Sequence, residues 1–109
     1  WIVAGLGGAE DVRERQKEFD ATGPISSEQL LKQLNEVMNE VKQVLDSTSP
    51  EALLEEKTVQ GFQETGLSIL VHVVEHFSYH VGQITYFVKW ITNQPTNYYE
   101  GLELDSTGN

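Results

Sequence analysis

Hydrophobic and polar positions follow two long helical patterns along the chain. In the first, apolar residues recur at steps of three and four from Leu30 to Leu45, with charged and amide side chains between them. This spacing predicts an amphipathic helix that packs one face on a core. Ser26 can cap the start of this helix, and Gln29, three residues later, completes a capping box.

The second pattern runs from Thr65 to Asn93 and is apolar on nearly every side of the predicted helix. A buried strand could also be apolar throughout, but strands usually run only about 4 to 8 residues. Thr65 is a suitable N-cap, and Asn93 followed by Pro95 predicts the end of the helix. Because Glu75, Gln83 and three histidines fall inside it, we do not expect this helix to span a membrane.

The remaining segments carry weaker patterns. The run Gly5–Gly8 is expected to end a helix that the chain enters midway at Trp1. Residues 9–20 are mostly charged and predict a solvated helical turn or a loop. Ser49–Leu54 predicts a short turn. Residues 55–64 predict an extended loop that leads into the second long helix.

Together these elements predict an all-α fold. We expect a single helical-bundle domain over residues 1–109, with residues 98–109 as a C-terminal tail whose aromatic residues could fold back over the bundle. The chain starts without Met, in what reads as the middle of a helix, so we expect a fragment of a longer protein. Missing elements or a partner chain would then cover the apolar faces that two helices cannot bury on each other.

Composition narrows the range of partners. Seventeen acidic and seven basic residues give a formal net charge of −10, which argues against nucleic acid or an anionic membrane as a partner. The chain has no cysteine, and this excludes disulfides, thiolate ligands and a cysteine nucleophile. A cytoplasmic location is expected.

The candidate chemistry lies in three histidines of the second long helix. His72, His76 and His80 follow one another at intervals of four, so their rings lie on one face on successive turns. Two imidazoles at this spacing can hold one metal ion, whereas the first and third are about 12 Å apart along the axis, too far to share one. Burying such groups unpaired costs about 1 to 3 kcal/mol each, which favours a divalent metal site over a purely structural role.

A competing motif overlaps the same residues. The run His72-Val73-Val74-Glu75-His76 fits H-x-x-E-H, the inverted zinc-peptidase order. Such a peptidase needs a third ligand well downstream and a substrate cleft, and only a short stretch follows His76. Because five-residue matches also arise by chance, this interpretation is the less favoured one.

The run from His76 to Ile84, HFSYHVGQI, resembles the closing-helix signature of the DinB-like superfamily, H-x-x-x-H-x-G-Q-I. The segment from Arg13 through Phe19 into the helix capped by Ser26 is similar to the middle region of that superfamily. The resemblance implies a four-helix bundle, often dimeric, in which three histidines hold Zn²⁺, Ni²⁺ or a similar ion. His76 and His80 match the two ligands of the last helix, and the third would come from the second helix.

This chain departs from the superfamily pattern in one respect, since no histidine precedes His72. The first helix of the bundle and part of the second are therefore expected to be missing, with the third ligand upstream of residue 1. His72 then becomes an additional histidine beside the ligands or facing solvent. Gln83 is expected either to support a ligand or to serve as a core amide.

Members of the superfamily include thiol-dependent transferases and isomerases. The resemblance therefore implies a divalent-metal-dependent enzyme of the transferase or hydrolase class, forming a homodimer and acting on a small molecule, with a low-molecular-weight thiol as a co-substrate. No catalytic residue is assigned, because Glu75 points about 60° to 100° away from the line of histidines. The alternative is a metal-stabilised helical interaction module without catalytic activity, which the large apolar surface favours.

Overall fold

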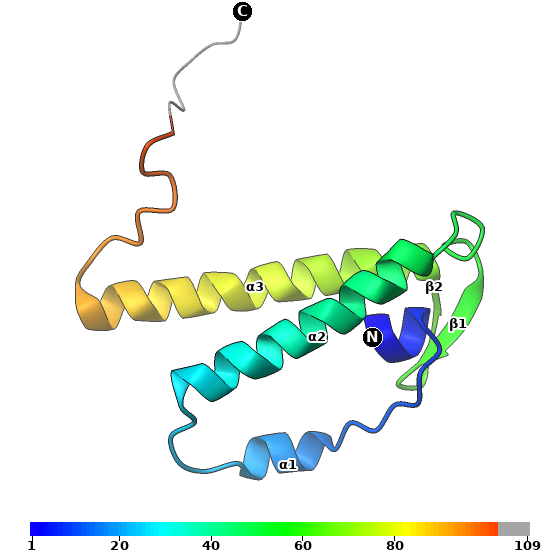
Figure 1. The fold of residues 1–109 in the computed structure, drawn as a ribbon, viewed down its shortest axis with the longest axis horizontal. Helices are drawn as coiled ribbons and strands as arrows, with labels where there is room; N and C mark the ends of the chain where they lie inside the picture. Colours follow the sequence, from blue (N-terminus) through cyan, green and yellow to red (C-terminus); the bar gives the residue numbers. More distant parts are fainter. Residues whose placement is uncertain (103–109) are drawn as a thin grey trace, which may run out of the picture. The chain divides into compact units, whose positions relative to one another are not determined.

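The computed structural model describes residues 1–102, which form a mostly helical fold with a small β-hairpin (Figure 1). Its elements in chain order are a π-helical turn η1 (Ile2–Leu6), α1 (Arg15–Asp20), α2 (Ser27–Ser47), β1 (Glu56–Val59), β2 (Phe62–Thr65) and α3 (Gly66–Thr92). These residues divide into two compact units, one from Trp1 to Val74 and one from Glu75 onward. Within the described part of the chain, no helix is long and apolar enough to cross a membrane.

The core of the first unit is built around the turn η1. Four hydrophobic side chains are buried in the described residues, namely Ile2, Leu6, Val59 and Ile69. The turn packs against both α2 and β1, and its glycines allow the close approach. A Cβ at Gly5 would lie 2.9 Å from Val59 Cγ2, and one at Gly7 would lie 2.7 Å from Val44 Cγ2.

The helix α2 begins where the sequence predicts. The Ser26 hydroxyl accepts a hydrogen bond from the Gln29 backbone N–H at 3.2 Å, and the Gln29 side-chain oxygen accepts one from the Ser26 backbone N–H at 3.4 Å, so the capping box is complete. Only Val41 and Val44 of this helix pack beside the buried cluster. The predicted apolar face is thus present, and within the first unit its C-terminal part packs on the core.

Residues 56–65 differ from the expected loop, because they form an antiparallel hairpin. Val59 pairs with Phe62 across a two-residue turn in which Gln60 has a φ of 50° and Gly61 a φ of 87°. Two successive residues with positive φ produce the turn that suits the twist of paired strands. The prediction of an all-α fold is therefore wrong in this segment, while the mostly helical character of the chain is confirmed.

The weaker predictions for the first unit are close to the structure. The charged stretch contains the short helix α1, and Arg13 forms an ion pair with Glu18 at 2.7 Å. The helical turn at the N-terminus continues to Leu6 and ends at Gly7, whose N–H donates to the Ile2 carbonyl at 2.9 Å. That i to i+5 bond is the π-helical pattern.

The helix α3 has the limits that its caps predict. The Thr65 hydroxyl accepts a hydrogen bond from the Ser68 backbone N–H at 3.1 Å, and the helix ends before Asn93, which has a left-handed φ of 50°. In the second unit the segment after Asn93 bends back to the helix, where the Tyr98 hydroxyl lies 2.8 Å from the Thr85 hydroxyl. Residues 103–109 of the predicted tail lie outside the described residues.

Candidate metal centre

His76 and His80 are neighbours on one face of α3, within the second unit. Their Nε2 atoms lie 3.0 Å apart. The two rings meet edge to face, with centroids 4.5 Å apart and planes 85° apart. The structure therefore brings together the two histidines that the sequence analysis selects as ligands.

The distance between the two nitrogens suits a shared ion. Imidazole nitrogens bind Zn²⁺ at about 2.0 to 2.1 Å, so two that share one ion lie about 3 to 3.5 Å apart. Within residues 1–102, no three His, Asp or Glu side chains gather in a position to hold one ion. The histidine pair accordingly offers two ligand positions, and the remaining positions would be filled from elsewhere.

Gln83 and Tyr79 extend the pair into a chain of hydrogen bonds. The Oε1 atom of Gln83 lies 3.0 Å from Nδ1 of His80, and the Nε2 atom of Gln83 donates to the Tyr79 hydroxyl at 3.1 Å. Gln83 was expected either to support a ligand or to serve as a core amide, and its contact with His80 favours the first role. Tyr79 was not expected at the site, although its spacing of four residues from Gln83 places both on one helix face.

The side chains of the site lie at the surface of the second unit. The side chains of His76, His80 and Gln83 are all exposed in the described part of the chain. The sequence analysis expects elements outside residues 1–109 to cover this face, so burial of the pair stays a prediction. The distance between the two nitrogens is the observation that supports the site.

His72 takes part in a different contact, in the first unit. Its ring stacks on Trp1, with centroids 4.1 Å apart and planes 25° apart, and Trp1 Nε1 donates to the Gln60 side-chain oxygen at 2.9 Å. Trp1 thus links the first histidine of the series to Gln60 in the hairpin turn.

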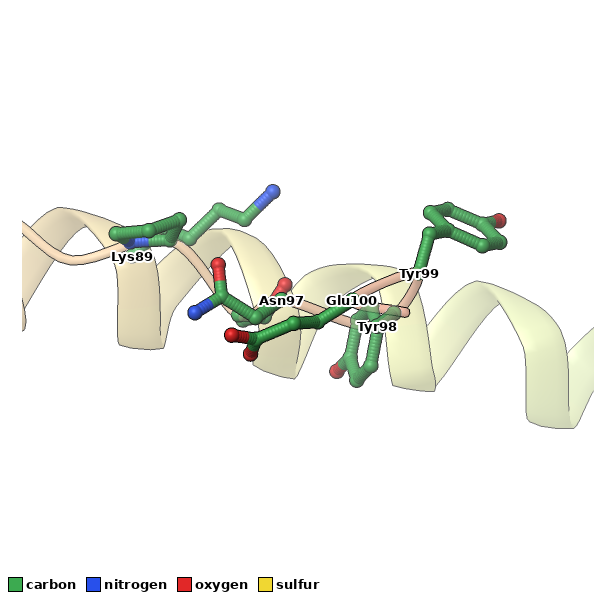
Figure 2. A pocket seen from close by; sticks show the side chains of 7 residues that line it. Lys89, Asn97, Tyr98, Tyr99 and Glu100 are labelled. Carbon is green, nitrogen blue, oxygen red and sulfur yellow. The ribbon is translucent and has the colours of Figure 1, made fainter. Parts of the chain in front are cut away.

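Two shallow hollows lie on the surface of the second unit. One runs along α3 past Gly82 and is lined by Glu75, Ser78, Tyr79, Gly82, Gln83 and Tyr86. The other, shown in Figure 2, lies between the last turns of α3 and the returning segment, with Lys89 on the helix and Asn97, Tyr98, Tyr99 and Glu100 on the segment. The first hollow includes Gln83 and so adjoins the hydrogen-bonded chain that contains the histidine pair.

These features define a small, mostly helical domain with a candidate two-histidine ligand pair on its longest helix. Residues 4–100 match the family model described as "Protein of unknown function (DUF1572)". Because the match covers most of the chain, the protein belongs to the DUF1572 family. Comparison with curated proteins and with solved structures gives no match.

Proposed function

We propose that this protein is a divalent-metal-dependent enzyme of the DinB-like type, in which His76 and His80 bind the ion together with a third histidine from outside residues 1–109. The observation that carries the proposal is the 3.0 Å distance between the two Nε2 atoms. Imidazole nitrogens suit Zn²⁺ and Ni²⁺, and these two ions are the favoured candidates.

The DinB-like assignment depends on the H-x-x-x-H-x-G-Q-I run, and the positions of its residues support it. The two histidines meet through their Nε2 atoms, and the glutamine bonds to the second of them. A Cβ at the glycine, Gly82, would meet no atom within 4 Å, so this part of the helix is open to a neighbouring element. The polar residues of the signature therefore form one connected group.

A four-helix bundle, with its first helix and part of its second supplied from outside this chain, would account for the exposed apolar side chains. On α2, exposed apolar residues include Leu30, Leu31, Leu34, Val37 and Met38. On the part of α3 in the second unit, they include Phe77, Val81, Ile84, Phe87 and Ile91. Additional helices, or a second copy of the chain in a homodimer, would remove these side chains from water.

The proposed reaction class follows from the number of protein ligands. A divalent ion held by three imidazoles keeps positions open, at which it can activate a bound water or thiol. The chain's own contribution is to bring two imidazole nitrogens close together and to orient one ring through Gln83. The proposed substrate is a small molecule, with a low-molecular-weight thiol as co-substrate, and the class is transferase or hydrolase.

Metal analysis of the full-length protein tests this proposal. We expect the unmodified protein to carry about one ion per chain and the His76→Ala, His80→Ala double variant to carry almost none, because a third ligand alone binds weakly. His72→Ala is the matched control, since it removes a histidine of the same helix and should keep the ion. Equal metal content in the double variant and the unmodified protein would contradict the proposal.

The second candidate function is a metal-stabilised helical interaction module without catalytic activity. The exposed apolar residues of α2 and α3 favour it, because large exposed apolar surfaces typically bind other proteins. X-ray absorption spectroscopy of the metal-loaded protein separates the two candidates. An ion with a water-filled position favours the enzyme, whereas four protein ligands around the ion favour the module.

A further inference from the structure

Tyr79, Gln83, His80 and His76 are connected by successive hydrogen bonds. The contacts run from the Tyr79 hydroxyl to Gln83 Nε2 at 3.1 Å, from Gln83 Oε1 to His80 Nδ1 at 3.0 Å, and from His80 Nε2 to His76 Nε2 at 3.0 Å. All four residues belong to α3 and share one side of it. All of these contacts therefore lie within one helix of the second unit.

The chemistry of these groups determines where the protons lie. An amide oxygen can only accept a hydrogen bond, so the His80 Nδ1 that faces it must carry the hydrogen. A neutral imidazole has one N–H, and His80 Nε2 is therefore left with its lone pair. In the neutral ion-free pair the 3.0 Å contact between the two Nε2 atoms then requires His76 to donate. The two rings hold opposite tautomers.

Tyr79 acts on the amide of Gln83 rather than on the histidine nitrogens. Its hydroxyl accepts from Gln83 Nε2, which leaves the amide oxygen facing His80. Its ring also lies beside that of His80, with centroids 5.5 Å apart and planes 63° apart. Both contacts limit the rotation of groups that are otherwise exposed.

We propose that Gln83 is a positioning residue that holds His80 in the Nδ1–H tautomer, and that Tyr79 orients Gln83 for this role. The inference rests on the proposed function in one respect. The tautomer matters for function only if His80 binds the ion, because this tautomer leaves the lone pair of Nε2 available. Partners of this kind fix the ring of a metal-binding histidine and make it a better ligand. Their loss typically lowers metal affinity by about 10- to 100-fold.

The first test is made on the ion-free protein, by two-bond ¹H–¹⁵N correlation spectra of the histidine rings. The expected spectrum shows His80 as the Nδ1–H tautomer and His76 as the Nε2–H tautomer. Gln83→Leu removes the acceptor and should release His80 into a mixture of tautomers. Gln83→Glu keeps an acceptor at this position and should retain the Nδ1–H form. A predominant Nε2–H form of His80 in the unmodified protein would overturn the proposal.

The second test measures the affinity for Zn²⁺ by competition with a chromophoric chelator, in the full-length protein. Gln83→Leu should weaken binding by about 10- to 100-fold, Tyr79→Phe by less, and Gln83→Glu should restore it. Tyr86→Phe is the matched control, because Tyr86 lines the same hollow but lies outside the hydrogen-bonded chain. Far-UV circular dichroism checks that each variant keeps its helix content. Unchanged affinity in a folded Gln83→Leu variant would also overturn the proposal.

These results can be told apart from a failure of the proposed function. The His76→Ala, His80→Ala variant could keep its metal while the spectra of the ion-free protein show the expected tautomers. In that case the histidine pair does not bind the ion, but Gln83 still positions His80. If the double variant loses its metal and the spectra show the other tautomer, the function stands and the role of Gln83 does not.

Discussion

The ring of Trp1 lies face to face with that of His72, with centroids 4.1 Å apart and planes only 25° apart. This contact joins the first residue of the described chain to a turn of α3 within the first unit. The ring of His72 therefore has a different neighbour from the rings of His76 and His80, which contact each other. The contact therefore provides a test of which histidines bind metal and which stabilise the fold.

Replacing His72 should change stability and leave the metal in place. An aromatic pair contributes about 0.5 to 1.5 kcal/mol beyond the area that it buries, so His72→Ala should lower the free energy of unfolding by about that amount. Urea unfolding followed by tryptophan fluorescence measures the change. His72→Phe keeps a ring at this position and should lose less. A loss of metal in His72→Ala as large as in His76→Ala would assign His72 to the site instead.

Metal binding should weaken as the solution becomes more acidic. Imidazole binds metal only in its neutral form, so protons compete with the ion for its histidine ligands, and acidification should release the ion. Dialysis at a series of pH values, followed by metal analysis, measures this dependence. An unchanged metal content at pH 5 would argue strongly against imidazole ligands.

The ion pair of Arg13 and Glu18 predicts a local pH dependence at the start of α1. Hydrogen bonds from the Arg13 guanidinium lower the pKa of the Glu18 carboxyl below its ordinary value of 4.5. The unfolded chain therefore binds a proton first as the pH falls. The contribution of this pair is complete above pH 4.5 and is lost as the pH falls through the lower folded-state pKa. Carboxyl ¹³C titration of Glu18 should show the lowered pKa, and Arg13→Met should return it toward 4.5.

Gly61 in the hairpin turn and Gly82 in α3 should respond in opposite ways to substitution by alanine. Gly61 has a φ of 87°, which an alanine adopts only with strain, so Gly61→Ala should destabilise the first unit by about 1 kcal/mol or more. In a chain limited to residues 1–109, a Cβ at Gly82 would meet no atom within 4 Å, so Gly82→Ala should favour α3 by about 0.5 to 1 kcal/mol. Thermal unfolding of both variants measures the difference. Equal effects would contradict the left-handed turn at Gly61.

The hydrogen bond between Tyr98 and Thr85 should hold the returning segment against α3. Tyr98→Phe removes the hydroxyl that lies 2.8 Å from Thr85 and should weaken the attachment by about 0.5 to 1.5 kcal/mol. Faster amide hydrogen exchange in residues 96–100 would report the loss. Tyr99→Phe is the matched control, because Tyr99 is the adjacent residue and has no part in this bond. Equal exchange rates in the two variants would contradict the attachment.

The elements that sequence analysis predicts correctly have local causes. Ser26 and Gln29 start α2 through bonds within one turn, and Thr65 and Asn93 limit α3 in the same way. The hairpin was missed because each strand has only four residues of mixed polarity, and because glutamine is not among the residues that usually adopt a positive φ. A glycine at position 61 between two short β-branched and aromatic runs was the available signal.

In the candidate metal centre, too, the features that sequence analysis predicts are those with local causes. The spacing of four between His76 and His80 is enough to bring their nitrogens together, because helix geometry alone determines it. The role of Gln83 depends on side-chain rotamers, which the spacing leaves open, and the structure shows its bond to His80. Burial of the pair depends on segments distant in the chain or outside it, so it stays a prediction.

The position of η1 has a practical consequence for anyone who prepares this protein. Two of the four buried hydrophobic side chains in residues 1–102, Ile2 and Leu6, come from the first six positions. A variant that lacks residues 1–6 would lose half of these buried side chains, and we expect it to give lower solubility or yield.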